Sequence, residues 1–137
     1  VLYPNTNKLI IDVGTCITID FIDDQNNFLG GSISPGIDMR YKSLNNYTAN
    51  LPLLQMEDHF SFPGRSTSSS IHAGVLSGVC NEIIGVINKI NSQFDNVKVI
   101  LTGGNAKFLS KRLKITIFAN QNFILDGLNS ILNLNKD

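Results

Sequence analysis

The sequence of 137 residues has no tryptophan, two cysteines and four prolines, and only 16% of its residues are charged. A typical globular chain has about 25% charged residues. The two cysteines, Cys16 and Cys80, are too few and too far apart for a disulfide framework or a metal knuckle. This pattern favours a reduced, cytoplasmic protein.

An excess of charge of either sign is also missing, because eleven basic residues balance eleven acidic ones. Nucleic acids and anionic membranes attract clustered Lys and Arg, so we expect no nucleic-acid partner. No apolar run comes near the roughly 20 residues that span a bilayer, so we expect no membrane partner either.

Hydrophobic residues make up 42% of the sequence, enough for one packed domain of this length. The sequence begins Val-Leu-Tyr-Pro without an initiator methionine, and a strand-like run follows within a few residues. We therefore expect residues 1–137 to be a C-terminal piece of a longer protein, although trimming of the end would leave the same pattern.

The first third of the sequence predicts a β-meander. Residues 8–21 are rich in Ile, Val and Thr on both sides of Gly14, which is typical of two strands joined by a tight turn. A polar cluster at 23–27 then precedes a third strand over 28–33.

Helices and a long loop are expected in the middle. Helical spacing predicts a helix over 37–47, residues 50–63 read as a loop, and a long helix is expected over about 70–91. Gly74, Gly78 and Gly85 should each disfavour that helix by up to about 1 kcal/mol, so we expect their backbone to pack closely against a neighbouring element.

The last third predicts a buried strand over 97–102, a helix over 106–112, a further strand over 115–118 and an amphipathic helix over 123–134. The resulting order of elements indicates an α/β fold, with a mixed sheet built from the meander plus later strands and covered by helices.

Two glycine-bearing segments could bind phosphate. In the first, Asp12 ends a buried strand, Gly14 lets a phosphate approach the backbone, and Thr15 offers a hydroxyl and an N–H group. In the second, Gly103 and Gly104 join a strand to a helix, whose N-terminal N–H groups can face a nucleotide. An ordinary hairpin and a plain β–α turn explain these segments about equally well, and neither matches the dinucleotide-binding or P-loop motif.

A further segment, residues 63–67, places hydroxyl groups at a helix start, where they could hold a carboxylate or phosphate. Simple helix capping by these hydroxyls is the commoner explanation. His59 and His72 stand apart from any cluster of cysteines or carboxylates, so we expect no zinc site.

The order of these motifs along the chain resembles the type III pantothenate kinases, the Bvg accessory factor family of the acetate kinase/sugar kinase/Hsp70/actin superfamily. The segments that carry the resemblance are DVGTCIT, GGSISPGI with Arg40, TANLP, GRSTSSSIHAG, VILTGGNA and ILDGLNSIL. They cover nearly the whole chain, including the gaps between motifs.

The resemblance implies a ribonuclease-H-like (actin-like ATPase) domain, with residues 1–137 forming the C-terminal domain of a two-domain kinase. It also implies ATP-dependent phosphorylation of pantothenate, the first step towards coenzyme A, by a homodimer. The implied cofactors are a monovalent cation, K⁺ or NH₄⁺, and Mg²⁺ with ATP.

Individual positions match residues with roles in the family. Asp12 resembles the ligand of the monovalent cation, Thr15 with Gly14 resembles the contact to ATP phosphate, and Gly103 with Gly104 resembles the glycine pair on the adenosine side. Thr67 resembles the threonine that contacts pantothenate across the dimer interface.

Two segments of the family have no match in these residues: the D-x-G-N-T phosphate motif and the G-x-D-R segment that carries the general base. We therefore expect no catalytic residue within residues 1–137 and no kinase activity from them alone. Another small-molecule kinase of the same superfamily, or a non-catalytic regulatory or scaffold domain that binds nucleotide, remains an alternative.

Overall fold

The computed structural model describes residues 3–114, 117–120 and 122–135. Its first three strands are β1 (Asn7–Val13), β2 (Cys16–Ile22) and β3 (Phe28–Pro35), and each pairs antiparallel with the next. The predicted meander is confirmed, with β3 two residues longer than expected.

Two later strands extend the sheet on the other side of β1. Strand β4 (Val97–Thr102) runs parallel to β1, and the short β5 (Phe118–Ala119) runs parallel to β4. The strand order is β3-β2-β1-β4-β5, which confirms the mixed sheet of a ribonuclease-H-like domain. The strand predicted over 115–118 is seen from Phe118 onward, and residues 115–116 lie outside the described residues.

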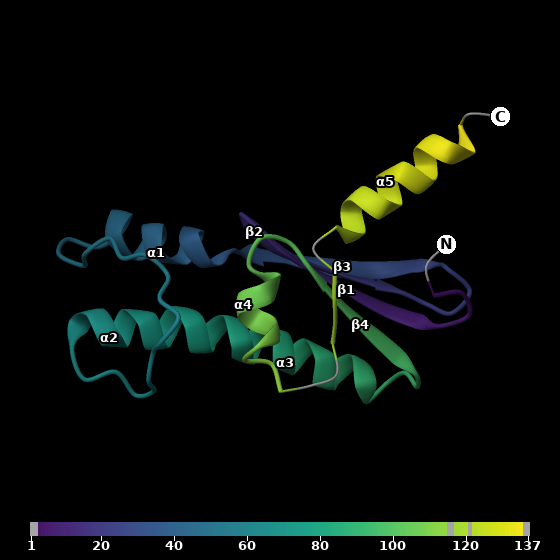
Figure 1. Ribbon diagram of the computed structural model, residues 1–137. Helices are drawn as coiled ribbons and strands as arrows, with labels where there is room; N and C mark the ends of the chain where they lie inside the picture. The colour runs from purple at the N-terminus through teal and green to yellow at the C-terminus, as the bar shows by residue number, and fades with distance from the viewer. Residues whose placement is uncertain (1–2, 115–116, 121, 136–137) are drawn as a thin grey trace.

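The helices are α1 (Ile37–Asn46), α2 (Thr67–His72), α3 (Gly78–Asn91), α4 (Ala106–Ser110) and α5 (Phe123–Leu134). A π-helical turn, η1 (Ala73–Ser77), joins α2 to α3 into one long rod (Figure 1). This rod begins at Thr67 rather than near residue 70, because Ser66 caps it: the Ser66 hydroxyl accepts from the Ser69 N–H at 3.2 Å.

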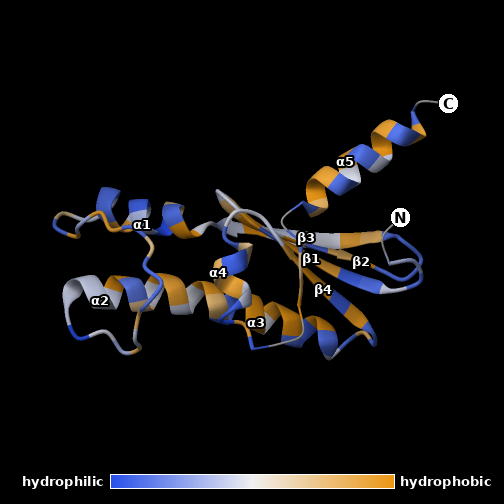
Figure 2. Ribbon diagram, in the orientation of Figure 1, coloured by the Kyte–Doolittle hydropathy of each residue, from blue (hydrophilic) through white to orange (hydrophobic). Residues whose placement is uncertain are grey.

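The core lies between one face of the sheet and the long helix. Alternate residues of the strands point to this face, as period-two alternation requires. Figure 2 shows apolar residues along α3 where it lies against the sheet. The buried residues of this layer include Leu9, Ile11, Val13, Ile17, Ile19, Val79, Ile83, Ile87 and Leu101.

Helix α5 leaves the far side of the sheet and projects away from the rest of the molecule (Figure 1). It has the predicted amphipathic pattern, but none of its residues is buried, and Leu128 and Ile131 are more than half exposed. A groove lined by Ile10 and Ile22 of the strands and by Phe123, Ile131 and Leu134 along α5 separates the helix from the sheet.

The expectation of close packing at the helix glycines is wrong. A Cβ atom built on Gly74, Gly78 or Gly85 would meet no atom within 4 Å among the described residues. The cost of these glycines to the helix is therefore not offset by contacts within the part of the chain that the structure describes.

The rod from Thr67 to Asn91 spans 25 residues and is long and apolar enough to cross a membrane by length and composition. The expectation that no stretch of the chain would approach that length is thus not met. Half of its apolar window is buried inside the molecule, however, as in the central helix of a packed core. Its apolar character is explained by this packing.

We predict that Gly85→Ala stabilises the chain by up to about 1 kcal/mol, because Ala favours an exposed helix position where its methyl group meets no neighbour. Urea unfolding followed by circular dichroism measures this change. A loss of stability would mean that the glycine face is closely packed.

Candidate functional site

The β1–β2 turn carries the first candidate residues. Asp12 lies at the carboxyl end of β1, opposite Thr18 of β2 and Thr102 of β4. The turn is closed by the Gly14 N–H, which donates to the Cys16 carbonyl at 3.0 Å, and Thr15 is exposed at its tip. The Thr15 side chain is therefore accessible to a ligand.

The β4–α4 turn lies directly against the first turn. Gly103 has a φ of +93°, a conformation that favours glycine, and the Asn105 N–H donates to the Val13 carbonyl at 3.1 Å. A Cβ atom on Gly103 would lie 2.7 Å from the Val13 carbonyl oxygen and closer still to Asp12 Oδ1. Only glycine lets the β4–α4 turn lie this close to the Asp12 carboxylate.

The two segments that the sequence offers as candidates for phosphate binding thus meet in one corner of the sheet, which we call the Asp12 corner: Asp12, Gly14, Thr15, Gly103 and Gly104. The corner forms because β1 and β4 are parallel, so their carboxyl ends lie at the same edge, where α/β proteins bind ligands. Its oxygen donors suit a hard cation. Among the described residues, no three His, Cys, Asp or Glu side chains come together as a metal cluster.

The start of α1 supports this corner from the other side. The Gly36 N–H donates to the Thr15 carbonyl at 3.0 Å. A Cβ atom on Gly36 would collide with the Gly14 and Thr15 carbonyl oxygens and lie 2.8 Å from the Thr15 carbonyl carbon. Glycine at position 36 is therefore needed for the close contact between the two segments.

An ion pair that the sequence did not reveal lies next to this contact. Arg40 of α1 and Glu82 of α3 are 2.5 Å apart (Nη2 to Oε2), and the Ser34 hydroxyl donates to the same carboxylate. Burial would raise the pKa of Glu82, but hydrogen bonds from Ser34 and Arg40 outweigh it and lower that pKa. The pair is therefore charged at neutral pH.

Thr67 lies elsewhere, at the first residue of the long helix. It is exposed and lines a pocket of about 550 Å³ between α1 and α2, whose other residues include Arg40, Ser43, Leu44 and Ile71. Within the described residues the structure does not bring Thr67 to the Asp12 corner. Helix capping, one of the two interpretations of this segment, is performed by Ser66.

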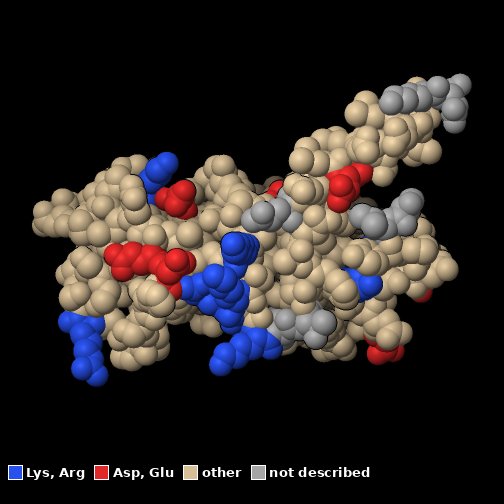
Figure 3. Space-filling view, in the orientation of Figure 1, with Lys and Arg blue, Asp and Glu red and all other residues tan. Residues whose placement is uncertain are grey.

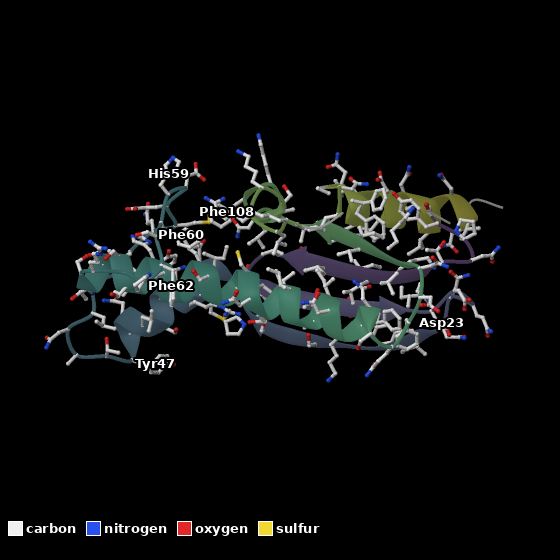
Figure 4. The ribbon with its side chains drawn as sticks, turned by 90° about the horizontal axis from the view of Figure 1, so that it is seen from below. Asp23, Tyr47, His59, Phe60, Phe62 and Phe108 are labelled. Carbon is white, nitrogen blue, oxygen red and sulfur yellow. The ribbon has the colours of Figure 1, made fainter. Side chains whose placement is uncertain are left out.

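The long loop before Thr67 is fastened at two places. Arg112 lies over the rings of Phe60 and Phe108, with its guanidinium carbon 5.7 Å and 3.6 Å from the ring centres, and also donates to the Asp58 carbonyl. Figure 4 shows Phe60 of the loop beside Phe108 of α4. This contact connects the loop to the helix that follows the Gly103–Gly104 turn.

The second fastening involves His72, which is buried. Its Nδ1 shares a hydrogen bond of 2.8 Å with the Tyr41 hydroxyl, and its Nε2 lies 3.5 Å from Glu57 of the loop. Burial, followed by the charges of Glu57 and Asp38, raises the pKa of Tyr41 to about 12. Glu57, 15 residues away in the sequence, is the one carboxylate that the described residues bring to His72, and the two form no cluster with further Cys, His or carboxylate side chains there.

Comparison with known proteins decides the family. Residues 1–89 match the family model described as type III pantothenate kinase. The chain belongs to the type III pantothenate kinase family.

Relatives in this family include the type III pantothenate kinase of Flavobacterium johnsoniae, which is 56% identical over 92% of this chain and 52% of its own length. That of Cytophaga hutchinsonii is 47% identical over 98% of this chain and 57% of its own length. The crystal structure of a Baf family protein from Campylobacter jejuni matches with a TM-score of 0.70 at 25% identity, over 94% of this chain and 58% of that one. The chain spans about half the length of the curated relatives it matches.

We predict that Gly103→Ala lowers the free energy of unfolding by about 2–4 kcal/mol, because it combines left-handed backbone strain with a clash against Asp12 and Val13. The neighbouring Gly104→Ala is the matched control. Its Cβ would meet open space, so we expect a change within about 0.5 kcal/mol in the same denaturation experiment. Equal effects of the two substitutions would contradict the close contact with Asp12.

Proposed function

We propose that the whole protein phosphorylates pantothenate with ATP to give 4′-phosphopantothenate, the first step of coenzyme A biosynthesis. The observation that carries the proposal is the Asp12 corner, where an exposed threonine hydroxyl and a glycine turn adjoin a carboxylate in a member of this family. Residues 1–137 would form the C-terminal domain of a two-domain, homodimeric and cytoplasmic enzyme.

The nucleotide would bind at the Asp12 corner. Thr15, with Gly14, would contact the ATP phosphates, and Gly103 with Gly104 would lie on the adenosine side. Lys and Arg side chains gather over α4 (Figure 3), next to the Gly103–Gly104 turn, and would attract a polyphosphate. The chain has no net charge, so this local concentration is what favours an anion at the corner.

Asp12 would hold the monovalent cation, K⁺ or NH₄⁺, and Mg²⁺ would accompany ATP. Asp12 lies where the β1–β2 turn and the β4–α4 turn meet, so a cation held by its carboxylate would sit next to phosphate bound at these turns. A cation there offsets the negative charge of the phosphate groups. Phosphoryl transfer depends on such charge neutralisation together with positioning.

Thr67 would contact pantothenate from the opposite protomer of the dimer. Its exposed position in the pocket between α1 and α2 supports this role, because none of the Asp12-corner residues lines that pocket. The general base would come from outside residues 1–137, which agrees with relatives about twice as long as this chain.

The reaction is tested with the full-length protein in an ADP-release assay, using pantothenate and a panel of other small alcohols as acceptors. We expect ADP release only with pantothenate, stimulated by K⁺ or NH₄⁺ but not Na⁺, and none from residues 1–137 alone. ADP release with another acceptor would indicate a different kinase of the superfamily, and ATP binding without transfer would indicate a non-catalytic domain.

For the cation, we expect Asp12→Asn to remove the K⁺ stimulation and lower kcat by about 100-fold, because the phosphate charge is no longer neutralised. Asp20→Asn is the matched control, since Asp20 lies on β2 on the same face of the sheet, two pairs further from the turn. K⁺ stimulation that survives Asp12→Asn would disprove the role of Asp12.

For the acceptor, we expect Thr67→Val to raise the KM for pantothenate by about tenfold or more while the KM for ATP stays constant, because one hydrogen bond to the substrate is lost. Thr67→Ser should restore binding. Ser68→Ala, at the exposed next residue outside the pocket, is the control. An unchanged KM for pantothenate in Thr67→Val would argue against this contact.

A further inference from the structure

The Arg40–Glu82 pair joins three elements that are far apart in the sequence. Arg40 lies on α1, Glu82 on α3, and Ser34 at the end of β3. Besides the contact with Glu82, Arg40 Nε donates to the Pro35 carbonyl at 2.8 Å, and Arg40 Nη2 lies 3.5 Å from the Ser34 hydroxyl. The guanidinium therefore holds the end of β3 against both helices.

A series of hydrogen bonds connects this pair to the Asp12 corner. Glu82 accepts from Arg40, Arg40 donates to the Pro35 carbonyl, and the next residue, Gly36, donates its N–H to the Thr15 carbonyl. The Arg40 N–H in turn donates to the Gly36 carbonyl at 3.1 Å, in the first turn of α1. The position of the Thr15 backbone thus depends on where Arg40 holds residues 34–36.

The pair is suited to this task because it is partly shielded and geometrically specific. The side chains of Arg40 and Glu82 are 21% and 31% exposed, and the planar guanidinium donates in two directions at once. Its charge is already balanced by Glu82, so it is a poor candidate for binding an anionic substrate itself.

We propose that Arg40 and Glu82 are positioning residues for the nucleotide site: they fix residues 34–36, which fix the Thr15 turn against bound phosphate. This inference rests on the proposed function of the Asp12 corner. Arg40 also lines the pocket that holds Thr67, whereas Glu82 does not, so the separate effect on the nucleotide is tested at Glu82.

The test measures the Kd for ATP by calorimetry, and both KM values by ADP release, on the full-length protein. We expect Glu82→Ala to raise the Kd and KM for ATP by about tenfold while the KM for pantothenate stays within about twofold. Loss of the pair would displace the Thr15 turn, and that turn contacts ATP. A purely structural role would instead lower the melting temperature and leave the Kd for ATP unchanged.

Conservative variants sharpen the test. Glu82→Gln should restore most of the ATP affinity, because its amide oxygen still accepts from Arg40. Arg40→Lys should not, because an ammonium group cannot reproduce the two-directional donation of the guanidinium. Lys42→Met, at an exposed position on the same helix, is the control and should change nothing. If Glu82→Ala does not fold, the comparison of Arg40→Lys with Glu82→Gln decides.

The outcomes distinguish this inference from the proposed function. Wild-type protein that binds ATP but does not phosphorylate pantothenate overturns the function, while the Kd values still test the positioning role. Wild-type activity with an unchanged Kd for ATP in both Glu82→Ala and Arg40→Lys overturns the positioning role alone. Absence of ATP binding by the wild type overturns both.

Discussion

The parallel pairing of β1 with β4 is the constraint on which the site depends. It brings residues 90 positions apart into register, Asp12 opposite Thr102, and it places the carboxyl ends of both strands at one edge of the sheet. The chain must then turn away at Gly103, with a positive φ, in the space beside the Asp12 carboxylate. A carboxylate, a glycine turn and an exposed hydroxyl meet there because of strand pairing, although each of the two segments is an ordinary turn on its own.

The surrounding elements stabilise that corner rather than add chemistry to it. Gly36 bonds the start of α1 to Thr15, and Arg40 and Glu82 hold that start against β3 and α3. On the other side, Arg112 connects α4 to the long loop that leads to Thr67. Contacts from α1 and α4 thereby hold both the Asp12 corner and the loop that leads to Thr67.

Local patterns in the sequence were enough to predict the strands and most helices. The β-branched residues on both sides of Gly14 specified the meander, and the Val97–Thr102 run specified β4, because short-range periodicity reports burial. Contacts across the fold leave no such local signal. Arg40 and Glu82 are 42 residues apart, and nothing in their neighbours indicates that they pair. The prediction of close packing at the glycines of the long helix fails for a related reason. A glycine in a helical pattern indicates a cost to helix stability, but the sequence does not show which atoms lie beside it.

Hydrogen–deuterium exchange of the full-length protein, with and without a non-hydrolysable ATP analogue and K⁺, tests whether the Asp12 corner binds nucleotide. If the Asp12 corner binds the nucleotide phosphates, the backbone amides of residues 14–15 and 103–105 become protected together when the analogue binds. Protection confined to other segments, with these amides exchanging as before, would contradict the account.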